Sequence, residues 1–229
     1  MPRGFQNHPC AYCVSGLSTR TGDHVFARNF FTEEQRGNLP KVPACVQCNH
    51  EKSTLEHYLA SALPFGGRHA DAQEALNRVG DRLAQNARLH QELAEGAQDG
   101  AIPFRGEALT NFMAFVVRGL LCYHWNVRVG DEHGVRVIHP TLAAEEAFEL
   151  YLRGNPRRRV DENLGNGTVR YVGLQIADYD QLSLWKIWMY GGVQLSGHQA
   201  GAADSSTSVI ALTARQEFLA RPAIAAVFG

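Results

Sequence analysis

The sequence reads CAYC at residues 10–13, DHV at residues 23–25 and CVQCNHEK at residues 45–52. The four cysteines form two Cys-x-x-Cys turns, and each turn offers two thiolates at the spacing that a tetrahedral ion requires. We therefore predict a structural zinc site made by Cys10, Cys13, Cys45 and Cys48. Such a site would be closed, because four thiolates leave no exchangeable position on the metal.

Short extended segments and one helix are predicted around these cysteines. Residues 19–26 and 39–44 have the composition of short strands, and two prolines constrain the second. Residues 30–37 read as a loop or a short helical turn. Residues 51–63 place apolar side chains on one face of a helix that ends before a proline. Strand, strand and helix would then surround the metal within a first module, residues 1–66.

The remaining residues, 67–229, predict a region of mixed helix and strand. Apolar residues recur at helical spacing over 69–97, 107–125 and 141–153. The segment 69–97 is either one helix or a helix that breaks near Gly80. Alternating apolar residues predict strands over 169–177 and 183–195, with a further strand over 209–213. The expected fold class is α+β, with the zinc-bearing module first, then helices and a small β-sheet, joined by a linker at Gly66-Gly67.

The composition is that of an ordinary globular protein, with 45% hydrophobic and 20% charged residues. The first ten residues contain no apolar region of the signal-peptide type. The longest apolar stretch, residues 112–123, contains Arg118 and is too short to cross a bilayer. Paired cysteines without a signal peptide favour a reducing compartment. We therefore expect a cytoplasmic protein that does not contact a membrane.

The motifs Cys10-x2-Cys13, Asp23-His24-Val25, Asn38-Leu39 and Cys45-x2-Cys48-Asn49-x2-Lys52 resemble the HNH endonuclease family, also called His-Me finger nucleases. The likeness covers residues 8–60. It is closest to the subgroup that a four-cysteine zinc braces, which includes phage Holliday-junction resolvases. The resemblance implies a ββα-metal finger and a metal-dependent endonuclease that hydrolyses DNA phosphodiester bonds, nicking one strand per active site.

The resemblance also implies a role for each matching residue. His24 would be the general base that activates water, and Asn38 would position the loop that carries it. Asp23 and Asn49 would hold one catalytic divalent cation, Mg²⁺ or Mn²⁺, with His50 as the alternative to Asn49. These residue types suit the chemistry, because a neutral imidazole accepts a proton from water near pH 7. A cation bound by a carboxylate and an amide oxygen keeps positions open for the phosphate.

Four basic residues are the candidates for contact with nucleic acid. Lys52 belongs to the matched motif, and Arg157, Arg158 and Arg159 follow a predicted helix, where a solvated loop is the alternative interpretation. The net charge of −1 restricts any DNA contact to local patches.

Several functional alternatives stay open at this level. RNA is a further possible substrate, because its scissile phosphate is the same group. Cleavage of both strands would require a homodimer or two successive events. The alternative from a different class is a catalytically silent, zinc-stabilised module that binds nucleic acid or acts as an adaptor.

Overall fold

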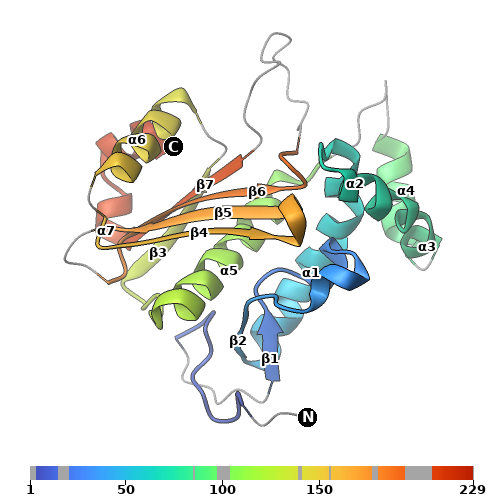
Figure 1. Ribbon diagram of the computed structural model, residues 1–229, viewed down its shortest axis with the longest axis horizontal. Coiled ribbons are helices and arrows are strands. Elements are labelled where there is room, and N and C mark those ends of the chain that lie inside the picture. The colour runs from blue at the N-terminus through green and yellow to red at the C-terminus, as the bar shows by residue number, and fades with distance from the viewer. Residues whose placement is uncertain are drawn as a thin grey trace.

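The computed structural model describes residues 4–14, 21–84, 86–96, 104–138, 141–154, 156–176, 180–193 and 208–228. A long helix, α5 (Gly106–Trp125), runs through the middle of the molecule between a strand-strand-helix unit and a five-stranded sheet (Figure 1). The fold is therefore a mixture of helix and sheet with a four-cysteine cluster near the N-terminus, as the sequence predicts. Within the described ranges, no helix is long and apolar enough to cross a membrane.

The N-terminal unit consists of β1 (Thr21–His24), β2 (Lys41–Ala44) and α1 (Val46–Ala62). The strands are antiparallel, and His24 lies opposite Lys41. Two 3-10 turns, Arg28–Phe30 and Glu33–Arg36, occupy the segment expected to be a loop or helical turn. Helix α1 begins at Val46 rather than at residue 51, because the sulfur of Cys45 caps it by accepting a hydrogen bond from the Cys48 amide at 3.5 Å. Residues 19 and 20 of the predicted first strand lie outside the described residues.

The prediction of one helix over 69–97 is wrong. After a short 3-10 turn (Leu63–Gly66), the chain forms α2 (Ala70–Asn77), α3 (Val79–Ala84) and α4 (Ala87–Gly96). The first break falls at Arg78, and Gly80 lies inside α3. Before α4 the side-chain oxygen of Asn86 accepts a hydrogen bond from the Leu89 amide at 3.1 Å. An asparagine in that position starts a new helix. Residue 97 lies outside the described residues.

Helix α6 (Leu142–Arg153) confirms its prediction, including both ends. The Thr141 hydroxyl accepts from the Ala144 amide at 3.2 Å, and Gly154 closes the helix. Two short helices, α7 (Gln216–Leu219) and α8 (Pro222–Phe228), follow the last strand.

All neighbouring strands in the five-stranded sheet are antiparallel, in the order β3-β7-β6-β5-β4. Three strands confirm predicted strands, but the strand predicted over 183–195 is too long, because it ends at Met189. Tyr190, Gly191 and Gly192 have positive φ and turn the chain there. Residues 177, 194 and 195 lie outside the described residues. The two edge strands escape prediction from sequence, because their exposed and half-buried side chains give no strong apolar alternation. The strands are β3 (His133–Ile138), β4 (Arg158–Leu164), β5 (Val169–Gln175), β6 (Ser183–Met189) and β7 (Ser208–Arg215).

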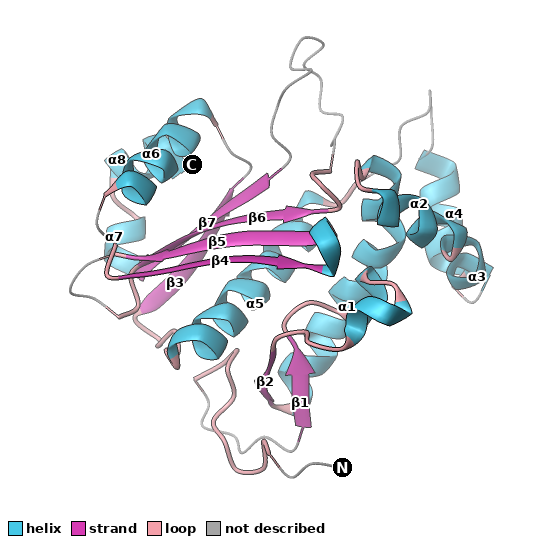
Figure 2. Cartoon of the chain, in the orientation of Figure 1, coloured by secondary structure: helices cyan, strands magenta, loops and turns pink. Residues whose placement is uncertain are grey.

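Each face of this sheet packs against helices (Figure 2). Trp185, Ile187 and Met189 of β6 belong to the core cluster that includes α5, while Phe148 of α6 packs in a second cluster on the other face. Both Trp185 and Tyr190 are fully buried. Their rings therefore belong to the core.

One buried cluster contains residues from both sides of the predicted boundary between 1–66 and 67–229. A Cβ on Gly67 would lie 2.5 Å from Ala72 Cβ and 2.8 Å from Tyr190 Cβ. The chain therefore crosses the boundary through a tightly packed contact at Gly67, although both glycines of the expected linker are half-buried.

Gly173 offers a direct test of the sheet packing. A Cβ there would lie 2.3 Å from the ring of Trp185, its partner on the neighbouring strand. We expect Gly173→Ala to lower the free energy of unfolding by about 1–3 kcal/mol, because the buried ring has to move. Denaturant unfolding measures this, with Gly37→Ala as the control, since a Cβ on Gly37 meets no atom within 4 Å. Equal stability of the two variants would contradict the packing.

Candidate zinc centre and the adjacent Asp-His site

The four predicted zinc ligands lie together. Their sulfur atoms are all within 4.8 Å of one another, and those of Cys13 and Cys45 are 3.9 Å apart. A zinc ion with Zn–S bonds of about 2.3 Å sets tetrahedral S···S edges of about 3.8 Å. Across the described ranges this is the one group of three or more His, Cys, Asp or Glu side chains with metal-ligand proximity. The cluster therefore fits a structural zinc ion.

The surroundings of the sulfurs favour the thiolate form once a metal is bound. Cys10 Sγ accepts hydrogen bonds from the amides of Tyr12 at 3.4 Å and Cys45 at 3.3 Å. Burial raises the pKa of the Cys10 and Cys48 thiols, so without a cation they hold their protons. A bound metal would displace these protons, which ties the site to folding.

Arginines from the second half of the chain complete the cysteine site. Arg128, three residues after α5, donates hydrogen bonds to the carbonyls of Cys10 and Cys13, each at 3.0 Å. Burial lowers the pKa of Arg118 on α5, and the nearby Cys48 and Cys13 act against that shift. Four thiolates around one zinc carry a net charge of −2, so two adjacent guanidinium groups would compensate it.

The Asp23 carboxylate points to the buried side of β1 and is already engaged. Its Oδ2 accepts a hydrogen bond from the Tyr12 hydroxyl at 2.6 Å and lies 3.0 Å from Lys52 Nζ. Burial, followed by the charge of Asp23, raises the pKa of Tyr12, so this hydroxyl stays protonated and donates. Only 11% of the Asp23 side chain is exposed. The other carboxylate oxygen, Oδ1, has no partner among the described residues.

Lys52 is not the exposed phosphate contact that the sequence suggests. Its side chain is fully buried. The ammonium donates to the carbonyl of His24 at 2.7 Å, pairs with Glu56 one helical turn later, and lies 5.7 Å from the centre of the Phe112 ring. A lysine held in this way cannot reach a DNA backbone. It instead fixes the Asp23-His24 dipeptide to α1.

This buried cluster contains two carboxylates for one ammonium. Burial raises the pKa of Glu56 to about 7, although Lys52 acts to lower it. Near neutral pH the cluster of Asp23, Lys52 and Glu56 therefore lies between neutral and a charge of −1. The cluster would attract a further cation only when Glu56 is ionised.

His24 is half-buried at the end of β1, among cations. Burial lowers its pKa from the usual 6.5, and Lys41 and Arg28 add to that effect, while Asp23 opposes it. The imidazole is therefore neutral at pH 7, as a general base needs to be. Lys41 and Arg28 are both exposed, and neither forms an ion pair within the described ranges. Sequence reasoning missed these two residues, because only the strand pairing and the turn after β1 bring them to His24.

The other candidate residues of the matched motif are less well placed. Asn49 is half-buried on α1, one turn before Lys52, and His50 beside it is exposed. Asn38 is exposed, and no hydrogen bond of its side chain occurs in the described part of the chain. A backbone bond from the Val25 amide to the Pro40 carbonyl, at 2.9 Å, holds the two strands together here. The roles expected of Asn38 and Asn49 stay predictions.

The three arginines proposed for nucleic acid each have a partner. Arg157 pairs with Asp180 at 2.7 Å, and Arg159 with Asp161 at 3.5 Å. Arg158 donates to the carbonyl of Trp125 at 3.4 Å. Arg158 and Arg159 open the edge strand β4 rather than lying in a loop. Their contact with nucleic acid also stays a prediction.

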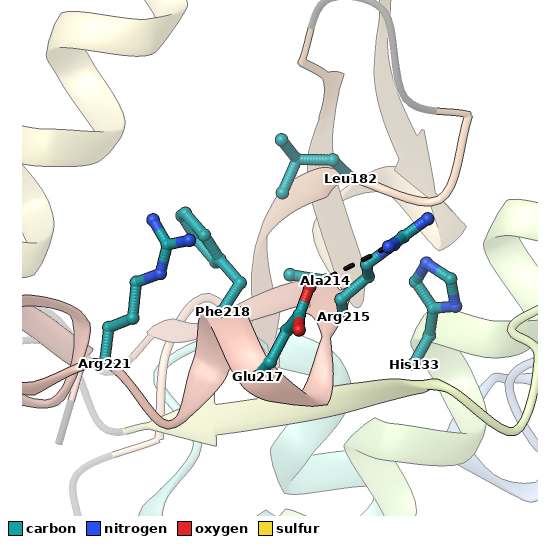
Figure 3. Close-up of a pocket in the computed structure, with 7 residues that line it drawn as sticks. All are labelled: His133, Leu182, Ala214, Arg215, Glu217, Phe218 and Arg221. Carbon is teal, nitrogen blue, oxygen red and sulfur yellow. Dashed lines mark ion pairs between the residues drawn. The ribbon is translucent and has the colours of Figure 1, made fainter.

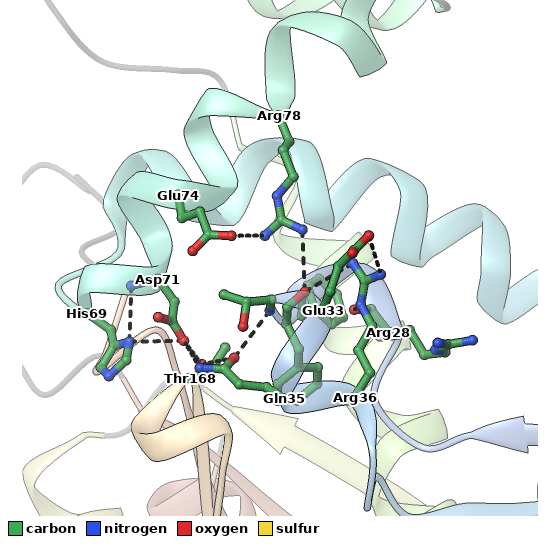
Figure 4. A network of polar contacts seen from close by, with 12 residues as sticks. Arg28, Glu33, Gln35, Arg36, His69, Asp71, Glu74, Arg78 and Thr168 are labelled. Carbon is green, nitrogen blue, oxygen red and sulfur yellow. Dashed lines mark hydrogen bonds and ion pairs between the residues drawn. The ribbon is translucent and has the colours of Figure 1, made fainter.

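A polar network ties the turns after His24 to the rest of the molecule (Figure 4). Asp71 on α2 accepts a hydrogen bond from Gln35 at 2.8 Å and another from Thr168, at the start of β5. Arg36 donates to the carbonyls of Arg28 at 3.0 Å and Phe31 at 3.2 Å. The buried Tyr190 hydroxyl donates to the Phe30 carbonyl at 3.1 Å. The segment that presents Arg28 is therefore held by residues from both halves of the chain.

Comparison with known proteins found no matching family model, no matching curated protein and no matching solved structure.

The cysteine cluster predicts one tightly bound zinc ion per chain. Cys48→Ser should lose the metal and melt at a markedly lower temperature, because zinc binding contributes directly to folding. Metal analysis and thermal unfolding measure both effects. Cys122→Ser is the matched control, since this half-buried thiol is not part of the cluster. Wild-type protein that unfolds at the same temperature with and without zinc would contradict the assignment.

Removing the buried ammonium should be strongly destabilising. We expect Lys52→Met to lower the free energy of unfolding by about 3–5 kcal/mol, because two buried carboxylates lose their partner. The double variant Lys52→Met/Glu56→Gln should regain part of that loss, since it leaves one carboxylate, which Tyr12 still binds. Denaturant unfolding at pH 8, where Glu56 is largely ionised, gives both values. A double variant no more stable than the single one would show that charge burial is not the cause.

Proposed function

We propose that this protein is a metal-dependent HNH endonuclease that hydrolyses DNA phosphodiester bonds and nicks one strand per active site. The observation that carries the proposal is a half-buried, neutral His24 on a strand that the zinc cluster and Lys52 brace. Beside it stand two cations that form no ion pair among the described residues. The order of β1, β2 and α1 around four cysteines supports a ββα-metal finger, and the motif resemblance supports the family.

In this proposal the residues of the chain divide the work between them. His24 accepts a proton from the attacking water, because its imidazole is neutral at pH 7. Lys41 and Arg28 bind the phosphate of the substrate strand and align it, since guanidinium and ammonium groups on one surface favour a polyanion. Lys52 acts indirectly, by holding the backbone of His24 and the carboxylate of Asp23 in place.

The proposed catalytic cation, Mg²⁺ or Mn²⁺, would be held by Asp23 and Asn49. Hard oxygen donors suit either ion, and Asp23 Oδ1 is the donor that Tyr12 and Lys52 leave open. When bound, such a cation neutralises negative charge that develops on the phosphate. The zinc ion stays structural, because its four ligands are thiolates.

The second candidate is a zinc-stabilised module that binds nucleic acid without cutting it. The ion pair between Asp23 and Lys52 favours this function, because an ammonium at 3.0 Å competes with any divalent cation. In that case Arg28 and Lys41 would still bind phosphate. DNA affinity should then fall steeply as salt rises, whereas an adaptor for proteins would show no such dependence.

The test is cleavage of supercoiled plasmid by zinc-loaded protein with and without added Mg²⁺ or Mn²⁺. We expect nicked product that requires the added cation, and a loss of at least about 100-fold in rate for His24→Ala, the usual effect of removing a general base. His90→Ala, a substitution of an exposed histidine on α4, is the matched control and should cut like wild type.

A folded, zinc-loaded protein that binds plasmid but never cuts it would move the assignment to the binding module. Equal rates for His24→Ala and wild type would show that His24 is not the base.

A further inference from the structure

A pocket lies at the end of the sheet that α7 covers. Helix α7 lies well away from α1 (Figure 1). It has a volume of about 400 Å³ and is bounded by the start of β3, the end of β7 and α7 (Figure 3). Pockets for small molecules have volumes of about 300–1,000 Å³. None of the residues named for zinc or phosphodiester chemistry lines this pocket, so ligand binding here would be independent of the proposed function.

The pocket carries positive charge without full compensation. No carboxylate pairs with Arg221 anywhere in the described ranges, and its guanidinium lies over the ring of Phe218 at 5.2 Å. Arg215 pairs with Glu217 at 3.8 Å, but both side chains are mostly exposed, at 56% and 75%. Such a pair contributes little and can yield to a stronger anion. The two guanidinium groups stand on opposite sides of the pocket (Figure 3).

His133 adds a further polar group. Its ring makes no hydrogen bond within the described part of the chain, although it lies on β3 directly opposite Arg215. An imidazole in this place can donate to an anion or accept from a hydroxyl group. Leu182, Ala214 and the Phe218 ring supply the apolar part of the lining.

The frame that carries these side chains is fixed by hydrogen bonds. The amide of Gln216, the first residue of α7, donates to the Glu132 carbonyl at 2.9 Å, and its side chain donates to the Asp131 carbonyl at 3.0 Å. β3 pairs with β7 over its full length beside it. The pocket is therefore preformed, as ligand sites usually are.

We infer that this pocket binds a small organic phosphate with a planar aromatic body, the chemistry of a mononucleotide. Arginine is suited to phosphate because its fork of N–H donors matches the phosphate oxygens. An aromatic side chain stacks on a base of any type. The apolar lining beside Phe218 would receive the ring, and Arg215, Arg221 and His133 would hold the phosphate and sugar.

Calorimetric titration of the full zinc-loaded chain tests this, with AMP and GMP as probes. Adenosine and ribose 5-phosphate supply the two halves of the ligand separately. We expect at least one nucleotide to bind with a dissociation constant below about 1 mM, and at least about tenfold tighter than either half. No saturable binding of either nucleotide up to about 10 mM would overturn the inference. Equal binding of ribose 5-phosphate would also overturn it, because the aromatic body would then be irrelevant.

Variants place the binding in this pocket. Arg221→Ala and Phe218→Leu should each weaken nucleotide binding about tenfold, the effect of losing about 1.4 kcal/mol. Arg153→Ala, a substitution of an exposed arginine at the end of α6, is the matched control and should bind like wild type. Thermal unfolding verifies that each variant is folded. Unchanged affinity in a folded Arg215→Ala/Arg221→Ala double variant would assign the nucleotide to another site and overturn the proposal.

Discussion

The buried ammonium of Lys52 is the contact on which the Asp-His site depends. It joins the Asp23 carboxylate, the His24 carbonyl and Glu56, and so attaches strand β1 to helix α1. A charge without water is stable only when surrounding groups replace its hydration, and here three oxygen atoms do so. Because the ammonium sits directly behind the dipeptide, any shift of α1 along its axis would move His24 as well.

The cysteine cluster also depends on groups that come from distant parts of the chain. Its backbone is held from outside by Arg128, and Arg118 on α5 would help to compensate the charge of the zinc-bound cluster, so the first 66 residues rely on the second half of the chain. Tyr190, at the end of β6, reaches back to Phe30 and supports the turns beside His24. The five-stranded sheet and α5 therefore form the frame that gives the N-terminal unit its shape.

The two proposed sites differ in how their charges are paired. At the Asp-His site, buried carboxylates and an ammonium nearly cancel, and the positive charge that the described residues present to solvent there comes from Arg28 and Lys41. At the α7 pocket, two arginines stand beside an apolar lining. The net charge of −1 reveals neither arrangement, because the local electric field depends on which charges are paired.

Local patterns were sufficient to predict the cysteine cluster, the long helix α5, helix α6 and the central strands, because Cys-x-x-Cys spacing and apolar periodicity act over a few residues. The same patterns failed where distant parts of the chain meet. Lys52 looks like a surface cation in the sequence, and it is buried because Asp23, Glu56 and Phe112 come from three elements that close around it. Lys41 joins His24 only through the pairing of β1 with β2, and Arg28 joins it through the turn after β1. Pairing and desolvation of charges are long-range effects, so they follow from the packed structure and not from residue spacing.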